Sequence, residues 1–336
     1  MTMAREPGLA DGGQDAAGRI DVHAHYVPAE LQASLPDAPA FRGFAAWQPQ
    51  AALEMMDRQG IATAILSMVL ETAMFAAAGD AATARRVARS ANEAAAEAIR
   101  SCPNRFGGFA RLPLPDVDAA LAEIDYALGT LRLDGVVLLT NHDGIYLGDN
   151  RLDPVFDELN RRRAVLFLHP TVPPGIEHTS FGYLPSLIEF VFDTTRAVTH
   201  LALSGTLERC PDLRLIVPHA GGTIPFLVDR ISLLADRFVP GTQMRAPAGV
   251  EAYLRRLYYE LAISTNPHAV ASVLQLVGPE RLLYGSDWPA LDEADVQSLI
   301  QVLGANPLLN PADRARIEWQ NAMELFPRLR SGSAAR

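Results

Sequence analysis

The sequence predicts a single (β/α)8 TIM barrel of the α/β class, and three observations support this prediction. Short apolar runs alternate with longer amphipathic stretches along the whole chain. This alternation is typical of parallel strands joined by right-handed helical crossovers, which close into a barrel. The apolar runs are nearly continuous, as expected for strands buried on both faces. The length of 336 residues suits one such barrel.

The expected barrel spans residues 19–326, with a Gly-, Ala- and Asp-rich tail at 1–18 and a second tail at 327–336. The predicted strands are Arg19–His25, Ile61–Met68, Arg105–Leu112, Gly135–Thr140, Ala164–His169, Leu213–His219, Tyr258–Ile263 and Arg281–Gly285. The predicted helices are Pro49–Gln59, Ala81–Ser101, Val117–Thr130, Pro154–Arg163, Leu184–Glu208, Ile224–Phe238, Pro267–Val277, Glu293–Leu303 and Pro311–Leu325. Pro49 in a first turn and Asp116 before Val117 are typical helix-start signals.

Two loops are expected to shape the mouth of the barrel. Segment 28–47 contains several prolines and shows no helical period, so we interpret it as a small insertion after the first strand. Segment 171–183 is the second such loop. The main alternative fold is a doubly wound open sheet. That fold requires a glycine-rich phosphate-binding turn after the first strand, where this chain has His23-Ala24-His25.

Three histidines and one aspartate at strand ends predict a metal site. His23 and His25 lie two residues apart in a strand, so their imidazoles share one side of it. His169 and Asp287 each follow an apolar run. The carboxyl ends of barrel strands meet at one mouth, where active sites form. Imidazole and carboxylate ligands suit a borderline divalent ion, Zn²⁺ in our prediction, with Mn²⁺ as the alternative.

His219 is the fourth candidate histidine, and two roles fit it. It ends another strand-like run and precedes Ala220-Gly221-Gly222, where glycine allows close approach of the backbone to a substrate. It could be a further ligand or an unliganded acid/base, and we favour the second role. Asp287 is a candidate proton-transfer group as well as a ligand. The chain contains no lysine, which excludes a Schiff base and a carboxylated lysine bridge, so one metal ion is expected.

Composition restricts the partners and the compartment. The net charge of −10 argues against nucleic acid as a partner. No apolar run approaches the length of a membrane span, and the N-terminus lacks the apolar core of a signal peptide. Two cysteines, Cys102 and Cys210, provide no disulfide framework, which fits a reducing cytoplasm. We therefore expect a cytoplasmic protein that acts on a small molecule.

With these residues assembled, the chain resembles the amidohydrolase-related (β/α)8 family, of the metal-dependent hydrolase type. Its best-known members are non-oxidative, metal-dependent decarboxylases of aminocarboxymuconate semialdehyde, γ-resorcylate and 6-methylsalicylate. The resemblance covers nearly all of 19–326 and is carried by Asp21-Val22-His23-Ala24-His25, Phe192-Asp193-Thr194-Thr195-Arg196, Ser204-Gly205-Thr206-Leu207, His219-Ala220-Gly221-Gly222 and Gly285-Ser286-Asp287. The segments 112–116 and 135–141 look most like the 6-methylsalicylate branch.

The resemblance implies roles for individual residues. It implies that His23, His25, His169 and Asp287 bind the metal and that His219 is catalytic without being a ligand. It also implies a homodimer in which Arg230 reaches the neighbouring subunit and holds a substrate carboxylate with its planar guanidinium. Phe192 and Trp288 are further expected substrate contacts. The third position after Asp287, aromatic in many relatives, is Ala290 here.

Three functions follow as hypotheses. The first is decarboxylation of a small aromatic or enoic carboxylate of the 2-hydroxybenzoate type, with Asp287 or His219 as proton donor. The second is hydrolysis of an ester, lactone or amide by metal-bound hydroxide at the same site. The third is a non-catalytic barrel, which the intact set of candidate ligands argues against. Release of carbon dioxide discriminates the first from the second, and bound metal discriminates both from the third.

Overall fold

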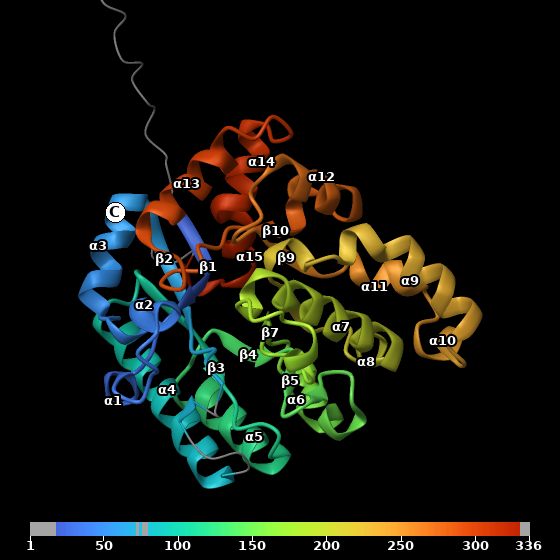
Figure 1. The fold of residues 1–336 in the computed structure, drawn as a ribbon, viewed down its shortest axis with the longest axis horizontal. Helices are drawn as coiled ribbons and strands as arrows, with labels where there is room; N and C mark the ends of the chain where they lie inside the picture. Colours follow the sequence, from blue (N-terminus) through green and yellow to red (C-terminus); the bar gives the residue numbers. More distant parts are fainter. Residues whose placement is uncertain (1–17, 72–73, 76–79, 330–336) are drawn as a thin grey trace, which may run out of the picture.

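The computed structural model describes residues 18–71, 74–75 and 80–329, and it confirms the predicted barrel (Figure 1). Eight parallel strands are hydrogen-bonded in the order β1-β2-β3-β4-β7-β8-β9-β10. Their bounds are Arg19–His25, Ile61–Ser67, Phe106–Arg111, Gly135–Leu139, Val165–His169, Arg214–Val217, Tyr258–Glu260 and Leu282–Leu283. Each lies within one of the eight predicted ranges. The two predicted tails lie outside the described residues, apart from Gly18 and 327–329.

Backbone hydrogen bonds join the two ends of the sheet. The amide of Val22 donates to the carbonyl of Tyr284 over 3.0 Å, and the amide of His25 donates to the carbonyl of Trp288 over 2.7 Å. A single parallel bridge pairs Ala24 with Trp288. The first strand therefore lies beside the segment that follows the last strand, which closes the barrel.

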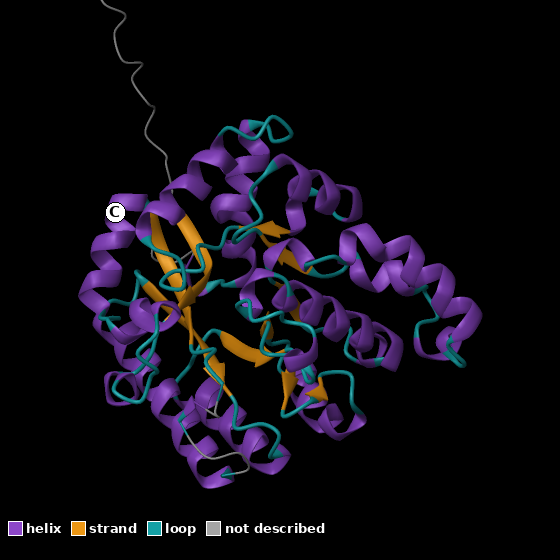
Figure 2. Ribbon diagram, in the orientation of Figure 1, coloured by secondary structure: helices purple, strands orange, loops and turns teal. Residues whose placement is uncertain are grey.

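Helices surround the strands on the outside (Figure 2). The longer ones are α3 (Pro49–Gln59), α4 (Ala81–Ser101), α5 (Val117–Ile124), α6 (Asp153–Arg161), α7 (Glu189–Ser204), α9 (Ile224–Phe238), α12 (Pro267–Leu276) and α13 (Glu293–Gly304). The short ones are α1 (Ala29–Gln32), α2 (Arg42–Ala45), α8 (Thr206–Arg209), α10 (Thr242–Arg245), α11 (Val250–Leu254), α14 (Pro311–Ala315) and α15 (Asn321–Leu325). A small antiparallel hairpin, β5 (Asn141–His142) with β6 (Ile145–Tyr146), follows β4.

Three of the predicted helices are divided in the structure, and Val117–Thr130 is one of them, because a wider turn over Asp125–Thr130 follows α5. Leu184–Glu208 was expected to be continuous, but α7 begins at Glu189 and ends at Ser204. Gly205, with φ of 90°, ends α7 in the left-handed conformation that terminates many helices, and α8 starts after it. Pro185 begins a separate single turn that ends at Leu187. The predicted helix Pro311–Leu325 is also divided, because a wider turn over Arg316–Gln320 joins α14 to α15.

Apolar side chains fill the inside of the barrel and support the mouth. One buried cluster contains Ile20, Val22, Ile65, Phe109, Val137, Phe167, Ile216 and Leu283, which come from seven of the eight strands. Phe109 and Phe167 stack in it with ring centroids 5.4 Å apart. The ring centroid of His23 lies 4.8 Å from that of Phe167, so Phe167, one of these two stacked phenylalanines, packs directly below His23. Of the helices that the structure describes, none combines the length and apolar character needed to cross a bilayer.

Candidate active site and metal centre

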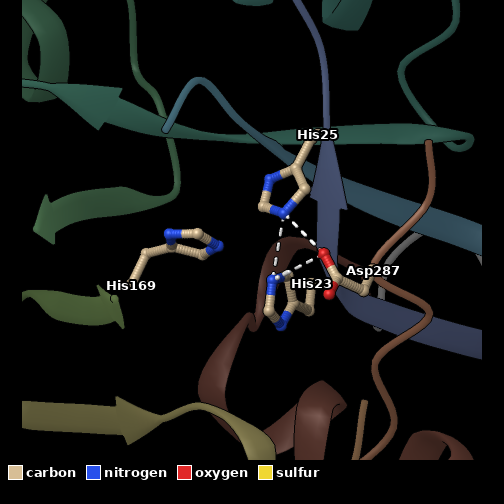
Figure 3. A group of neighbouring side chains, drawn as sticks. All are labelled: His23, His25, His169 and Asp287. Atoms are coloured by element: carbon tan, nitrogen blue, oxygen red, sulfur yellow. Dashed lines mark hydrogen bonds and ion pairs between the residues drawn. The ribbon is translucent and has the colours of Figure 1, made fainter. Parts of the chain in front are cut away.

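Four side chains converge at the mouth of the barrel (Figure 3). His23 and His25 come from β1, His169 ends β7, and Asp287 follows β10. All four are buried, and one ligand-type atom of each lies within 4.8 Å of the others. Nε2 of His25 lies 3.0 Å from Nε2 of His23 and 2.9 Å from Oδ1 of Asp287. The sequence predicted this group, and the structure brings its members together.

The second ring nitrogen of each histidine is already occupied. The Nδ1 atoms of the three histidines lie within hydrogen-bond distance of an oxygen: Oε1 of Glu260 for His23 at 2.9 Å, Oγ of Ser67 for His25 at 3.0 Å, and the carbonyl of Pro170 for His169 at 2.7 Å. Carboxylate and carbonyl oxygens only accept, and the Ser67 hydroxyl itself donates to the carbonyl of Ala24. Each Nδ1 is therefore assigned as the donor. Three Nε2 lone pairs and one carboxylate then face a common space, and such a set of acceptors fits a cation.

The electrostatics of the cluster favour one positive charge. Burial opposes an imidazolium at His23, but the charges of Glu260 and Asp287 outweigh it and raise the pKa to about 9. Burial lowers the pKa of His25, and burial together with the neighbouring histidines holds the pKa of His169 well below its usual value. Two imidazoles are thus held neutral, and the carboxylates place the single positive charge on His23, where a bound cation would replace the proton on Nε2 and leave all three imidazoles neutral.

Glu260 is a site residue that the sequence analysis missed. Its carboxylate is fully buried and accepts hydrogen bonds from Nδ1 of His23 and from the amides of His219 and Ala262, the last two over 2.7 and 2.6 Å. Burial opposes its ionisation, but the charge of His23 prevails and lowers the pKa of the Glu260 carboxyl. Glu260 therefore orients His23 and connects three strand ends. The available signal was a lone carboxylate after Tyr258-Tyr259 in an apolar strand.

Asp21 lies two residues before His23 on β1 and supports the same site. Its Oδ1 atom accepts hydrogen bonds over 3.0 Å from the amides of His23 and Ser286, and its Oδ2 atom accepts one from the Ser286 hydroxyl. Burial raises the pKa of this carboxyl to about 7, against the opposing effect of the bonds from Ser286. Asp21 thus fixes the segment that carries Asp287 against the segment that carries the two histidines.

His219 lies beside the cluster in a strained turn. His219 and Ala220 have φ of 53° and Asp287 has φ of 59°, values that non-glycine residues rarely adopt. Nε2 of His219 is 3.6 Å from Oδ2 of Asp287. Its Nδ1 is buried and has no hydrogen-bond partner within the described parts of the chain. Nε2 of His219 is therefore the ring nitrogen on the side of the Asp287 carboxylate.

The three predicted substrate contacts differ in exposure. Trp288 is partly buried and packs against the core. Phe192 on α7 is 41% exposed. Arg230 is exposed and belongs to α9, a helix that lies at the periphery of the molecule (Figure 1). No hydrogen bond or ion pair between described residues joins Arg230 to the four-residue cluster. Within this one chain, Arg230 therefore does not form part of the metal centre.

Comparisons with known proteins agree with this architecture. The model of a protein family described as amidohydrolase matches residues 20–328. A 6-methylsalicylic acid decarboxylase from Penicillium expansum is 32% identical over 318 residues, which cover 93% of this chain and 97% of the relative. A gamma-resorcylate decarboxylase from a Polaromonas species is 27% identical, with 82% and 86% covered. The crystal structure of a 2,6-dihydroxybenzoate decarboxylase in complex with 2,6-dihydroxybenzoate superposes with a TM-score of 0.79 at 25% identity, covering 92% of this chain and 99% of the other.

Proposed function

The chain belongs to the amidohydrolase family, and from this membership we propose that it is a metal-dependent, non-oxidative decarboxylase of a small aromatic carboxylate. The proposed substrate class is 2-hydroxybenzoates of the 6-methylsalicylate type. The observation that carries the proposal is the buried set of three Nε2 atoms and one carboxylate, each imidazole held through its Nδ1. The relatives named as decarboxylases, which match 82–93% of the chain, support the reaction type.

We assign one divalent ion, Zn²⁺, to His23, His25, His169 and Asp287. Three neutral imidazoles and one carboxylate suit zinc in donor type and number. When bound, the ion would supply a Lewis acid for the carboxylate and adjacent hydroxyl oxygen of the substrate. Glu260, Ser67 and the Pro170 carbonyl orient the imidazoles from behind.

Asp287 and His219 are the proposed proton donors. A proton passes from one of them to the ring carbon that bears the carboxylate, the bond from that carbon to the carboxylate breaks, and carbon dioxide leaves. A proton from solvent then restores the donor. The separation of 3.6 Å between the two groups allows them to exchange the proton after a small movement. Their burial at the mouth keeps bulk water from competing for it.

We further propose that the enzyme is a homodimer that uses Arg230 in the neighbouring site. The support is a set of exposed apolar side chains on the helix that carries this residue and on α7, which packs against that helix, with the loop before α7. Only Ile224 and Ala235 of α9 are buried. Large apolar side chains on α9, on the loop before α7 and on α7 are exposed: Phe181, Tyr183, Leu184, Leu187, Phe192, Phe226, Leu233 and Phe238. A surface of this kind is typical of a subunit interface.

Substitution of this arginine should impair substrate binding more than chemistry. We expect Arg230→Ala to raise KM for a carboxylate substrate by about 10–100-fold, the value of a charge-assisted hydrogen bond, with a smaller change in kcat. Arg237→Ala, on the same helix, is the matched control and should leave KM unchanged. Mixing Arg230→Ala with His219→Ala should restore activity, because a hybrid dimer contains one intact site. Absence of restored activity in hybrids verified by mass spectrometry would contradict the shared site.

Metal analysis combined with a screen for carbon dioxide release tests the function. We expect about one zinc per chain and release of carbon dioxide from 6-methylsalicylate or a related hydroxybenzoate. Removal of the metal by a chelator should abolish release, and added Zn²⁺ should restore it. Bound metal without carbon dioxide release, but with alcohol or amine release from esters or amides, would refute the decarboxylase and support a hydrolase.

A further inference from the structure

One residue at the barrel mouth has an unfavourable backbone that the proposed chemistry does not explain. Ile263 has φ of 55°. A positive φ is rare for any non-glycine residue and is a true outlier for a β-branched one. Such strain persists only where the surrounding structure enforces it, and it gathers at functional sites. His219, Ala220 and Asp287 share this conformation and surround the same site.

Ile263 follows the strand that lies between the two strands whose ends carry the proposed proton donors. It follows β9, whose neighbours in the sheet are β8 and β10. His219 comes two residues after β8, Asp287 comes four residues after β10, and Ile263 comes three residues after β9. The three strands are parallel, so these residues lie at the same mouth. All three residues have a positive φ, and among them only Ile263 has an apolar, β-branched side chain.

The turn that carries Ile263 is anchored to the metal centre. Oε2 of Glu260 accepts the amide of Ala262, while Oε1 of the same carboxylate accepts Nδ1 of His23. The amide of Ser264 closes the turn by donating to the carbonyl of Leu261 over 2.9 Å. Leu261 and Ala262 are fully buried and Thr265 is nearly so, whereas Ile263 is 49% exposed. The backbone of Ile263 is thus held in an unfavourable conformation, and its apolar side chain remains half exposed at the mouth of the barrel.

We infer that Ile263 is a substrate-contact residue that offers apolar surface to a ring substituent of the aromatic carboxylate. The inference rests on the proposed function and deepens it, because it names a determinant of the substrate. An isoleucine side chain favours a methyl substituent over a hydroxyl, which would lose its hydrogen bonds to water on contact. Discrimination by one such apolar contact amounts to about 10-fold or more. The protein should therefore prefer 6-methylsalicylate to 2,6-dihydroxybenzoate.

Two substitutions at Ile263 remove its contact with the substrate without adding backbone strain. Glycine and asparagine both tolerate the left-handed conformation, so Ile263→Gly and Ile263→Asn should fold, with unfolding temperatures close to that of the wild type or higher. The dissociation constants of 6-methylsalicylate and 2,6-dihydroxybenzoate are measured by calorimetry on zinc-loaded protein that also carries His219→Ala, because loss of a proposed proton donor slows turnover of the ligand during the titration. We expect both variants to reduce the preference for the methyl compound by about 10-fold. The control is Arg132→Gly, which relieves the same strain (φ of 59°) at an exposed position before β4, at the opposite end of the barrel.

The outcomes are distinct. A reduced preference in both variants, with an unchanged preference in Arg132→Gly, supports the inference. The wild-type preference in both Ile263 variants overturns it, as does a change in oligomeric state by light scattering without a change in preference, which would assign Ile263 to a subunit contact. Carbon dioxide release by the wild type is measured separately. Failure of the proposed function would therefore appear as absent release, whereas failure of this inference would appear as an unaltered binding ratio.

Discussion

Asp287→Asn will lower kcat for decarboxylation by about 10³-fold or more while leaving the barrel folded. The asparagine side-chain amide is nearly isosteric with the aspartate carboxylate, but it supplies neither the negative charge nor the proton. The backbone should be retained, because asparagine tolerates the φ of 59° at this position. The amide of residue 287 can still donate to the carbonyl of His23 over 2.8 Å, and its carbonyl can still accept the amide of Ala290. Carbon dioxide release, circular dichroism and metal content measure the three components of this expectation.

The matched control is Asp292→Asn, five residues further along the chain. Asp292 accepts the amide of Asp295 at the start of α13, and asparagine caps a helix as well as aspartate does. This variant should retain wild-type kcat and unfolding temperature. Activity like that of the wild type in Asp287→Asn would remove this residue from the chemistry. Loss of the folded state in Asp287→Asn would instead show that the carboxylate is needed for the fold.

Glu260→Gln will weaken metal binding by about 10–100-fold, although Glu260 is not one of the four proposed ligands. The carboxylate receives three hydrogen bonds, from Nδ1 of His23 and from the amides of His219 and Ala262. A glutamine side chain has one acceptor oxygen, so its NH₂ group must face at least one of these donors. The resulting unsatisfied donor costs about 1–3 kcal/mol of unfolding free energy, and the orientation of His23 is lost. Zinc affinity by chelator competition and urea unfolding of the metal-free protein measure the two effects.

Glu251→Gln is the control for this substitution. Glu251 lies on α11 and forms an ion pair with Arg255 at the surface, where both side chains are at least 40% exposed. Its replacement should change neither zinc affinity nor, by more than about 0.5 kcal/mol, the unfolding free energy. If Glu260→Gln destabilised the metal-free protein but bound zinc as tightly as the wild type, Glu260 would be a structural residue only.

The sequence was sufficient to predict the barrel because alternating strands and helices leave few closed topologies. It also indicated the metal centre, because two histidines two residues apart on a strand must point the same way, and the other candidates ended strands of the same parallel sheet. Glu260 could not be predicted in the same manner. Its role comes from hydrogen bonds to residues 237 and 41 positions away in the sequence, which depend on how three strand ends are packed.

The end of the helix within Leu184–Glu208 is determined by the backbone conformation of one glycine. Gly205 could continue a helix or end it, and only the packed structure places it in the left-handed conformation that ends α7. Arg230 presents a different problem. Its proposed partner is a substrate in a second subunit, so neither the sequence nor one chain alone contains the contact.

The closure of the sheet by its first and last strands has a consequence for biosynthesis. Two of the four proposed ligands are synthesised at the very start of the domain, whereas Asp287 is synthesised 262 residues after His25, and Ser286, which bonds Asp21, is synthesised 265 residues after that residue. A nascent chain that ends before Asp287 has neither a complete donor set nor a closed sheet. Loading of the proposed metal site is therefore a step that follows elongation, and metal occupancy would report that the first and last strands have paired.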